Sequence, residues 1–245
     1  MKQIHILNGD SLKEQFPTVQ IHGEMLVARE CLIEGPSNAK SLDAFLQIRS
    51  DFIKKSYGGS YAGTAEEIRK INSLTDAEVN LWFEEDLFCQ ANLWFVCSLL
   101  YLKRVNVFLV MPKDSLRYGF GGLNEQQLIE AFQNKKALTP VNVNQFALLW
   151  FAYQKNHIER LLKLGVQMHS DFPFVMRAIE AHFDRLPKGD KPGLPEQLIL
   201  DIMEEKSTND FGTIFREFIE RAPIYGFGDL QIKRIFDEIQ KNQEQ

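Results

Sequence analysis

The sequence predicts an α/β fold in which a mainly parallel sheet has helices on both faces and is followed by an all-helical C-terminal domain. Strand-type and helix-type segments alternate through the first part of the chain, the order that a parallel sheet requires. The strand-type runs are almost continuously apolar, as is typical of strands buried on both sides. After about residue 135 only helical spacing remains. A chain of 245 residues with 44% hydrophobic and 25% charged residues is ordinary for a globular protein and excludes a disordered one.

Four strands are expected in the first part of the chain, each followed by a turn or a helix. Apolar runs predict them at residues 3–7, 24–28, 79–83 and 105–111. Helical spacing predicts helices at residues 41–57 and 85–102. Two further helix starts are expected at residues 11–14 and 64–67, because both have the Ser/Thr-x-x-Glu pattern of a capping box.

The second part of the chain is predicted to be helical throughout. Helices are expected at residues 143–156, 158–164, 171–186, 194–205, 210–221 and 229–240, with a Pro- and Gly-rich linker at residues 187–195. We therefore divide the chain into an α/β domain at residues 1–135 and a helical domain at residues 136–245. Residues 194–245 have the helix count of a helix–turn–helix unit. The last helix has mixed charge, which favours packing over DNA binding.

Charge and cysteine content narrow the class of protein. Lys and Arg number 28 against 33 Asp and Glu, a net charge of −5, so a nucleic acid is not the expected partner. The chain begins without an apolar signal segment, and its most apolar stretch is too short for a membrane span. Three cysteines in a chain of this size fit the reducing cytoplasm. Cys89 and Cys97 lack a metal-ligand spacing and are expected to be small core residues.

Polar residues follow every predicted strand. Asn8-Gly9-Asp10 follows the first, Arg29-Glu30 the second, Glu84-Glu85-Asp86 the third and Pro112-Lys113-Asp114 the fourth. Parallel strands finish at one end of the sheet, here called the carboxyl edge, and ligands of open α/β sheets bind there. The candidate catalytic residues are Asp10, Glu84 and Asp86. The candidate ligand-binding residues are Asn8, Gly9, Ser11, Arg29, Glu30, Glu34 and Gln90.

The chemistry expected of these residues follows from their types. Asp10, Glu84 and Asp86 would hold a divalent cation or act as acid and base, and Arg29 would bind an anionic group. The competing interpretation is structural: Asp10 and Ser11 cap the first helix, and Glu84 to Asp86 offset the dipole of the next. Neither a phosphate-binding G-x-x-x-x-G-K-[ST] loop nor a G-x-S-x-G elbow occurs in the sequence. No metal and no cofactor can be named from the spacing.

Three blocks of the sequence resemble a bacterial family known as domain of unknown function 1835. They are His5-Ile-Leu-Asn-Gly-Asp-Ser11, Gly23-Glu-Met-Leu-Val-Ala-Arg-Glu-Cys-Leu-Ile-Glu-Gly-Pro36 and Leu81-Trp-Phe-Glu-Glu-Asp-Leu-Phe-Cys-Gln90. The resemblance implies a soluble, cytoplasmic bacterial protein with an α/β N-terminal domain, and it implies no activity. Ala28 stands where members of that family often have Trp, and Glu85 where many have His or an aromatic residue.

Two functions are compatible with these observations. The first is a site for a polar small molecule or nucleotide-type ligand at the carboxyl edge, with or without catalysis. The alternative is a regulatory or interaction protein that uses the C-terminal helices to bind nucleic acid or a protein partner. The oligomeric state is open.

Overall fold

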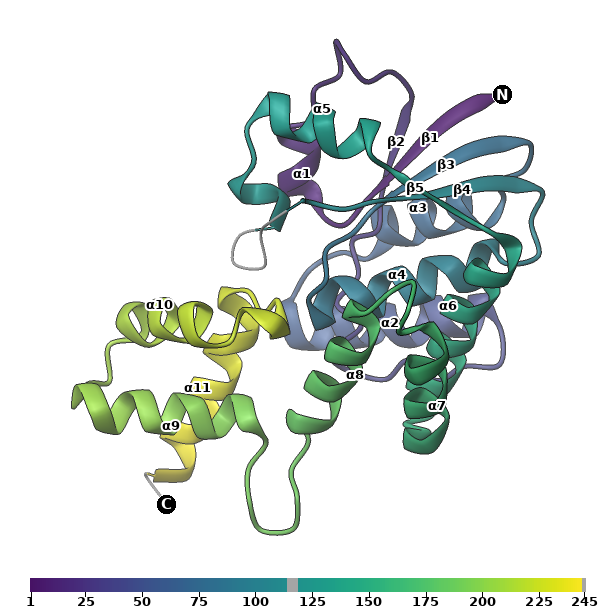
Figure 1. Cartoon of the computed structure of the whole chain (residues 1–245). Helices are drawn as coiled ribbons and strands as arrows, with labels where there is room; N and C mark the ends of the chain where they lie inside the picture. The colour runs from purple at the N-terminus through teal and green to yellow at the C-terminus, as the bar shows by residue number, and fades with distance from the viewer. Residues whose placement is uncertain (114–118, 244–245) are drawn as a thin grey trace.

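The computed structural model describes residues 1–113 and 119–243 and shows a five-stranded, mostly parallel sheet (Figure 1). The strands are β1 (Lys2–Leu7), β2 (Glu24–Val27), β3 (Ala77–Trp82), β4 (Val105–Val110) and β5 (Lys136–Leu138). Their order is β2-β1-β3-β4-β5; the first four are parallel, and β5 pairs antiparallel with β4. The predicted α/β fold class is confirmed, including the helical region that follows the sheet.

Helices cover both faces of the sheet. The α-helices are α1 (Asp10–Glu14), α2 (Leu42–Tyr57), α3 (Ala62–Asn72), α4 (Leu87–Leu100), α5 (Glu125–Gln133), α6 (Pro140–Tyr153), α7 (Ile158–Met168), α8 (Phe174–Asp184), α9 (Leu194–Lys206), α10 (Phe211–Arg221) and α11 (Asp229–Gln243). The short 3-10 helices are η1 (Gly119–Gly122) and η2 (Pro223–Tyr225). Figure 1 shows α1 and α5 on one face of the sheet and α3, α4 and α6 on the other.

The alternation of side chains along each strand produces two cores. Ile4 and Ile6 of β1 belong to the larger core, which includes the buried residues of α2, α3, α4 and α6. Leu7 of β1 and Trp82 of β3 belong to the smaller core, together with residues of α1 and α5. Because α6 and α8 pack against it in addition to the sheet, α4 is buried along almost its whole length.

Several element boundaries differ from the predictions for local reasons. The helix predicted to start with a capping box at residue 11 is α1, and it begins one residue earlier, after Gly9, which provides no side-chain cap. The helix predicted to start at Thr64 begins at Ala62. Neither α5 nor β5 is predicted by a pattern in the sequence. Two of the three residues of β5 are exposed, so it lacks the apolar run that marks the other strands.

Residues on both sides of position 135 contribute to the sheet layers. β5 lies immediately after that position and pairs with β4, and α6 packs against α4. The proposed division at residue 135 remains a prediction. Within the described part of the chain, no helix combines the length and apolar character needed to cross a membrane.

The last three helices pack on one another at the end of the molecule where β1, β3 and β4 finish (Figure 1). Ile232, Phe236 and Ile239 of α11 are buried between them and the rest of the chain. The predicted linker lies between α8 and α9. The structure does not test whether these helices form a helix–turn–helix unit that binds a partner.

His182 of α8 is buried at the junction between the helical layers. It is 4% exposed, and its Nδ1 accepts a hydrogen bond from Arg185 Nε at 3.2 Å. Because the arginine always donates, Nε2 carries the ring proton and donates to Asn156 Oδ1, also at 3.2 Å. Burial, with a further contribution from the Arg185 charge, lowers the pKa of His182 to about 3.

His182 therefore makes folding stability depend on pH. The pKa of His182 is lower in the folded than in the unfolded chain, so the folded state favours the neutral ring. Its contribution to folding stability is therefore complete above about pH 6.5 and is lost as the pH falls. We expect about 2 kcal/mol of unfolding free energy to be lost through this residue between pH 7 and pH 5. Urea unfolding at both pH values should show a smaller difference for His182→Gln than for wild type. The exposed His169→Gln is the control, and an unchanged pH difference in His182→Gln would contradict the assignment.

Candidate functional site

The strand order places a topological switch point between β1 and β3. The connection from β1 to β2 runs through α1 on one face, whereas the connection from β3 to β4 runs through α4 on the other. The chain therefore diverges at the adjacent carboxyl ends of β1 and β3. Ligands of open α/β sheets bind in the crevice at such a point. Asn8 follows β1 here, and Glu84 and Asp86 follow β3.

Two carboxylates and a thiol meet at this point. One ligand atom each from Glu84, Asp86 and Cys89 can be chosen so that all three lie within 4.8 Å of one another. The Cys89 Sγ lies 3.9 Å from Glu84 Oε2. Asp86 and Cys89 are buried, at 6% exposure each. We call these three residues the Glu84–Asp86–Cys89 cluster.

Two glycine segments press against the carboxylates of the cluster. The amide of Phe120, in η1, donates to Glu84 Oε1 at 2.7 Å. A Cβ added to the neighbouring Gly119 would lie only 1.9 Å from the Glu84 carboxyl carbon. A Cβ on Gly226, which follows η2, would lie 1.9 Å from Asp86 Oδ1. The backbone of the loop after β4 and that of the C-terminal region therefore cover the two acids directly.

Asp86 also has a local structural role. It is the N-cap of α4, and its Oδ1 accepts a hydrogen bond from the Cys89 amide at 2.9 Å. The capping interpretation is therefore correct for Asp86, although one cap leaves the Glu84 carboxylate beside it unexplained. Glu85 points elsewhere and pairs with Arg177.

Burial makes the charged forms of the cluster unfavourable. It raises the pKa of Glu84 to about 7, and the neighbouring Asp86 charge adds to this shift. Burial raises the pKa of Asp86 as well, and that of the Cys89 thiol well above its usual range. Within residues 1–113 and 119–243, no Lys, Arg or His pairs with either carboxylate. Of the basic side chains that the structure describes, none therefore supplies the positive charge that would offset the two carboxylates.

Amide side chains surround the cluster. Asn8 Nδ2 donates to Cys89 Sγ at 2.7 Å, and Asn92 Nδ2 donates to Asn8 Oδ1 at 2.8 Å and to the Glu30 carbonyl oxygen at 2.7 Å. Gln90 Nε2 donates to the Glu84 carbonyl oxygen at 2.6 Å. Gln90 is fully buried, and its amide oxygen has no hydrogen-bond partner among the described residues. The amide network thus fixes the cluster from the α4 side.

Asp10 and Arg29 form a separate, more exposed group. Arg29 Nε donates to Asp10 Oδ2 and Arg29 Nη1 to Glu67 Oε1, each at 2.7 Å. The Arg29 hydrogen bond lowers the pKa of Asp10. Within the part of the chain described, no hydrogen bond or ion pair joins Asp10 to Glu84 or Asp86. Arg29 has its charge balanced twice, which weakens the expectation that it binds an anion.

Glu30 and Glu34 are held by protein groups and not aimed at open space. Glu30 is 3% exposed and pairs with Arg49, which is 0% exposed, while the Tyr61 hydroxyl donates to its other oxygen. Glu34 accepts hydrogen bonds from Tyr57 and from Arg234 of α11. Both acids therefore have structural partners in this conformation.

Gly9 and Ser11 form the exposed rim of the carboxyl edge. Gly9 has φ +105°, a conformation that other residues adopt only with strain, and no atom lies within 4 Å of where its Cβ would be. Ser11 is exposed. Asp114 lies outside the described residues. Of the predicted site residues, Asn8, Glu84, Asp86 and Gln90 come together, while Asp10 and Arg29 pair beside them.

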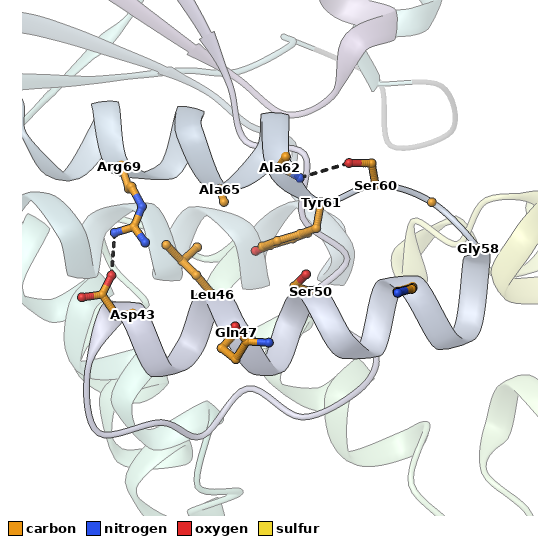
Figure 2. Close-up of a pocket in the computed structure, with 12 residues that line it drawn as sticks. Asp43, Leu46, Gln47, Ser50, Gly58, Ser60, Tyr61, Ala62, Ala65 and Arg69 are labelled. Carbon is orange, nitrogen blue, oxygen red and sulfur yellow. Dashed lines mark hydrogen bonds and ion pairs between the residues drawn. The ribbon is translucent and has the colours of Figure 1, made fainter.

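A groove of about 590 Å³ lies elsewhere, between α2 and α3 (Figure 2). Two of its charged lining residues pair with each other, Arg69 Nη1 with Asp43 Oδ1 at 2.5 Å, and the third, Lys54, is exposed. The Ser60 hydroxyl accepts a hydrogen bond from the Ala62 amide at 3.4 Å. By cavity volume the groove would be chosen over the Glu84–Asp86–Cys89 cluster as the candidate site. The groove, however, has no buried charge without a partner among its described residues. We place the candidate site at the cluster, where the chemistry is concentrated.

Three contributors to the site carried no signal in the sequence. Cys89 matched the apolar spacing of α4 and was assigned to the core; it is buried, as expected, but its sulfur faces the carboxylates. Asn92 lies near the middle of the apolar helix α4 and is fully buried. Gly226 is distant in sequence, and only the folded chain brings it to Asp86.

A scan against protein-family models and a search of curated proteins found no match to this chain.

Proposed function

We propose that the protein binds a polar small molecule at the carboxyl edge of its sheet, with Glu84 and Asp86 as the groups that hold a proton or cation for it. The observation that carries this proposal is the meeting of the half-buried Glu84 and the buried Asp86 carboxylates at the switch point, uncompensated by any basic side chain of the described residues. Perturbed acids in such a position are typical of functional sites.

The local charge supports a basic or hydroxyl-bearing ligand over a phosphate. Arg29 is already paired with Asp10 and Glu67, so its positive charge is not free to bind a phosphate. Ser11, at the rim of the carboxyl edge, is exposed to solvent, and no atom lies within 4 Å of an added Gly9 Cβ. Such a ligand would donate hydrogen bonds toward the Glu84 side of the cluster.

We expect ligand-induced thermal stabilisation that depends on Glu84. A panel of amines, amino sugars and nucleosides, with inorganic phosphate for comparison, should contain a class that raises Tm. At about 100 times its Kd a ligand adds about 2.7 kcal/mol, or roughly 5–10 °C for a chain of this size. Differential scanning fluorimetry should show this shift in wild type and in Glu85→Gln, the matched control. An equal shift in Glu84→Gln, or none in wild type, would refute the proposal.

The alternative function uses the C-terminal helices, and the contacts of α11 do not favour it. Gln231 Nε2 donates to Tyr57 Oη at 3.4 Å, and Arg234 pairs with Glu34 at 2.8 Å. These polar residues of the last helix are engaged with the α/β region and not presented to a nucleic acid. Cys31, Cys89 and Cys97 are all free thiols, which supports the cytoplasm as part of this proposal. The resemblance to domain of unknown function 1835 is likewise retained as a proposal.

A further inference from the structure

We propose that Glu84, Asp86 and Cys89 form the binding site of a divalent transition-metal ion of the zinc type. The inference rests on the proposed function, because it identifies the ion that the carboxylate pair holds at the switch point. It goes beyond that function by adding the thiolate of Cys89 and by restricting the class of metal.

The geometry of the three side chains is close to that of a metal site. Their ligand atoms lie within 4.8 Å of one another, and the ligands of a tetrahedral zinc ion are about 3.5 Å apart. Displacements of about an ångström in the ligand atoms, produced by side-chain rotation, therefore bring them to bonding distance from a common metal ion. The Asn8 amide donates to Cys89 Sγ, as outer groups do to metal-bound thiolates. Asn92 in turn holds the Asn8 amide through its oxygen.

A second observation lies next to the carboxylates. The amide of Gln90 is anchored on the Glu84 carbonyl oxygen by its nitrogen, while its buried oxygen lacks a donor among the described residues. An unpartnered buried acceptor costs about 1–3 kcal/mol. Three protein ligands leave the fourth tetrahedral position to a water molecule. A metal-bound water within reach of Gln90 would give this buried oxygen the donor that it lacks.

The ligand types select the metal. Mg²⁺ and Ca²⁺ require oxygen ligands in larger number, and a thiolate is a poor ligand for either ion. One thiolate with two carboxylates suits Zn²⁺ and its spectroscopic substitute Co²⁺. The carboxylates alone predict a divalent cation without specifying it, and the position of Cys89 beside them restricts that expectation to metals that bind thiolates.

The test is metal binding by full-length protein that has been treated with a chelator. We expect one Zn²⁺ per chain by calorimetry, and with Co²⁺ a near-ultraviolet thiolate charge-transfer band. Cys89→Ser should abolish this band and weaken Zn²⁺ binding at least about tenfold, since even outer groups of a metal site contribute that much. Cys97→Ser is the matched control, because Cys97 is a buried thiol of the same helix and should leave both signals intact.

The outcomes separate the metal from the ligand. Absent stoichiometric Zn²⁺ binding, or equal binding by Cys89→Ser and wild type, overturns the metal site. Folding of each variant is checked by circular dichroism, and Glu84→Gln provides a second substitution that should weaken Zn²⁺ binding if Cys89→Ser fails to fold. Thermal shifts by the amine and nucleoside panel in chelator-treated protein would leave the proposed function standing without the metal. Zn²⁺ binding without any such shift would leave the metal site and remove the small-molecule proposal.

Discussion

Arg49→Met should destabilise the protein by about 3–5 kcal/mol. Arg49 is fully buried, and its Nη2 pairs with Glu30 Oε2 at 2.9 Å. Its guanidinium also donates to the carbonyl oxygens of Glu34, at 2.6 Å, and Cys31, at 2.9 Å. Replacing it by an apolar residue leaves the Glu30 carboxylate buried without a counter-charge and removes the donors that hold the loop after β2. Urea unfolding monitored by circular dichroism measures the loss.

Two variants separate this effect from a general loss of an arginine. Arg69→Met removes an exposed ion pair with Asp43 and should cost less than about 1 kcal/mol. In the double variant Arg49→Met/Glu30→Gln the stranded charge is gone, and we expect at least about 1 kcal/mol to be recovered relative to Arg49→Met. A loss of less than 1 kcal/mol in Arg49→Met would show that the pair does not organise the loop.

The Arg49–Glu30 ion pair shows which property of the site residues cannot be predicted from the sequence. Arg29-Glu30 follows β2, so placing both at the carboxyl edge was reasonable. Their partners come from distant helices: Arg49 lies on α2 and Glu67 on α3. No local pattern states which acid will meet which base. A charged residue at a strand end is therefore predictable in position, whereas its availability to a ligand depends on tertiary pairing.

The fold was easier to predict than the site, because strands and helices are indicated by apolar patterns within each segment. Strands β1, β3 and β4 are largely buried, and their mostly apolar runs indicate this directly. The meeting of Asn8 with the residues after β3 follows from strand adjacency, which the βαβ order favours. β5 could not be predicted from the sequence, because its pairing with β4 depends on the free edge of β4 and not on the pattern of its own three residues.

Gly226→Ala should be the substitution that most directly disturbs the cover of the candidate site. Gly226 has φ +63°, and a Cβ there would lie 1.9 Å from Asp86 Oδ1 and 3.0 Å from the Phe88 Cβ. The left-handed conformation alone costs an alanine about 1–2 kcal/mol, and the collision adds a further overpacking cost of about 1–3 kcal/mol. Because Asp86 caps α4, either the C-terminal region or the cap must shift.

Gly189→Ala isolates the collision from the backbone strain. Gly189 has nearly the same φ, +64°, but no atom lies within 4 Å of its added Cβ. Urea unfolding should therefore place Gly226→Ala below Gly189→Ala in stability by about 1–3 kcal/mol. Hydrogen exchange should show faster exchange at the start of α4 and in η2 for Gly226→Ala alone. Equal stability of the two variants would mean that the C-terminal region does not bear on Asp86 in solution. Since the cap of α4 and the cover of the cluster share one contact, a loosened Gly226 segment should expose the carboxylates to solvent.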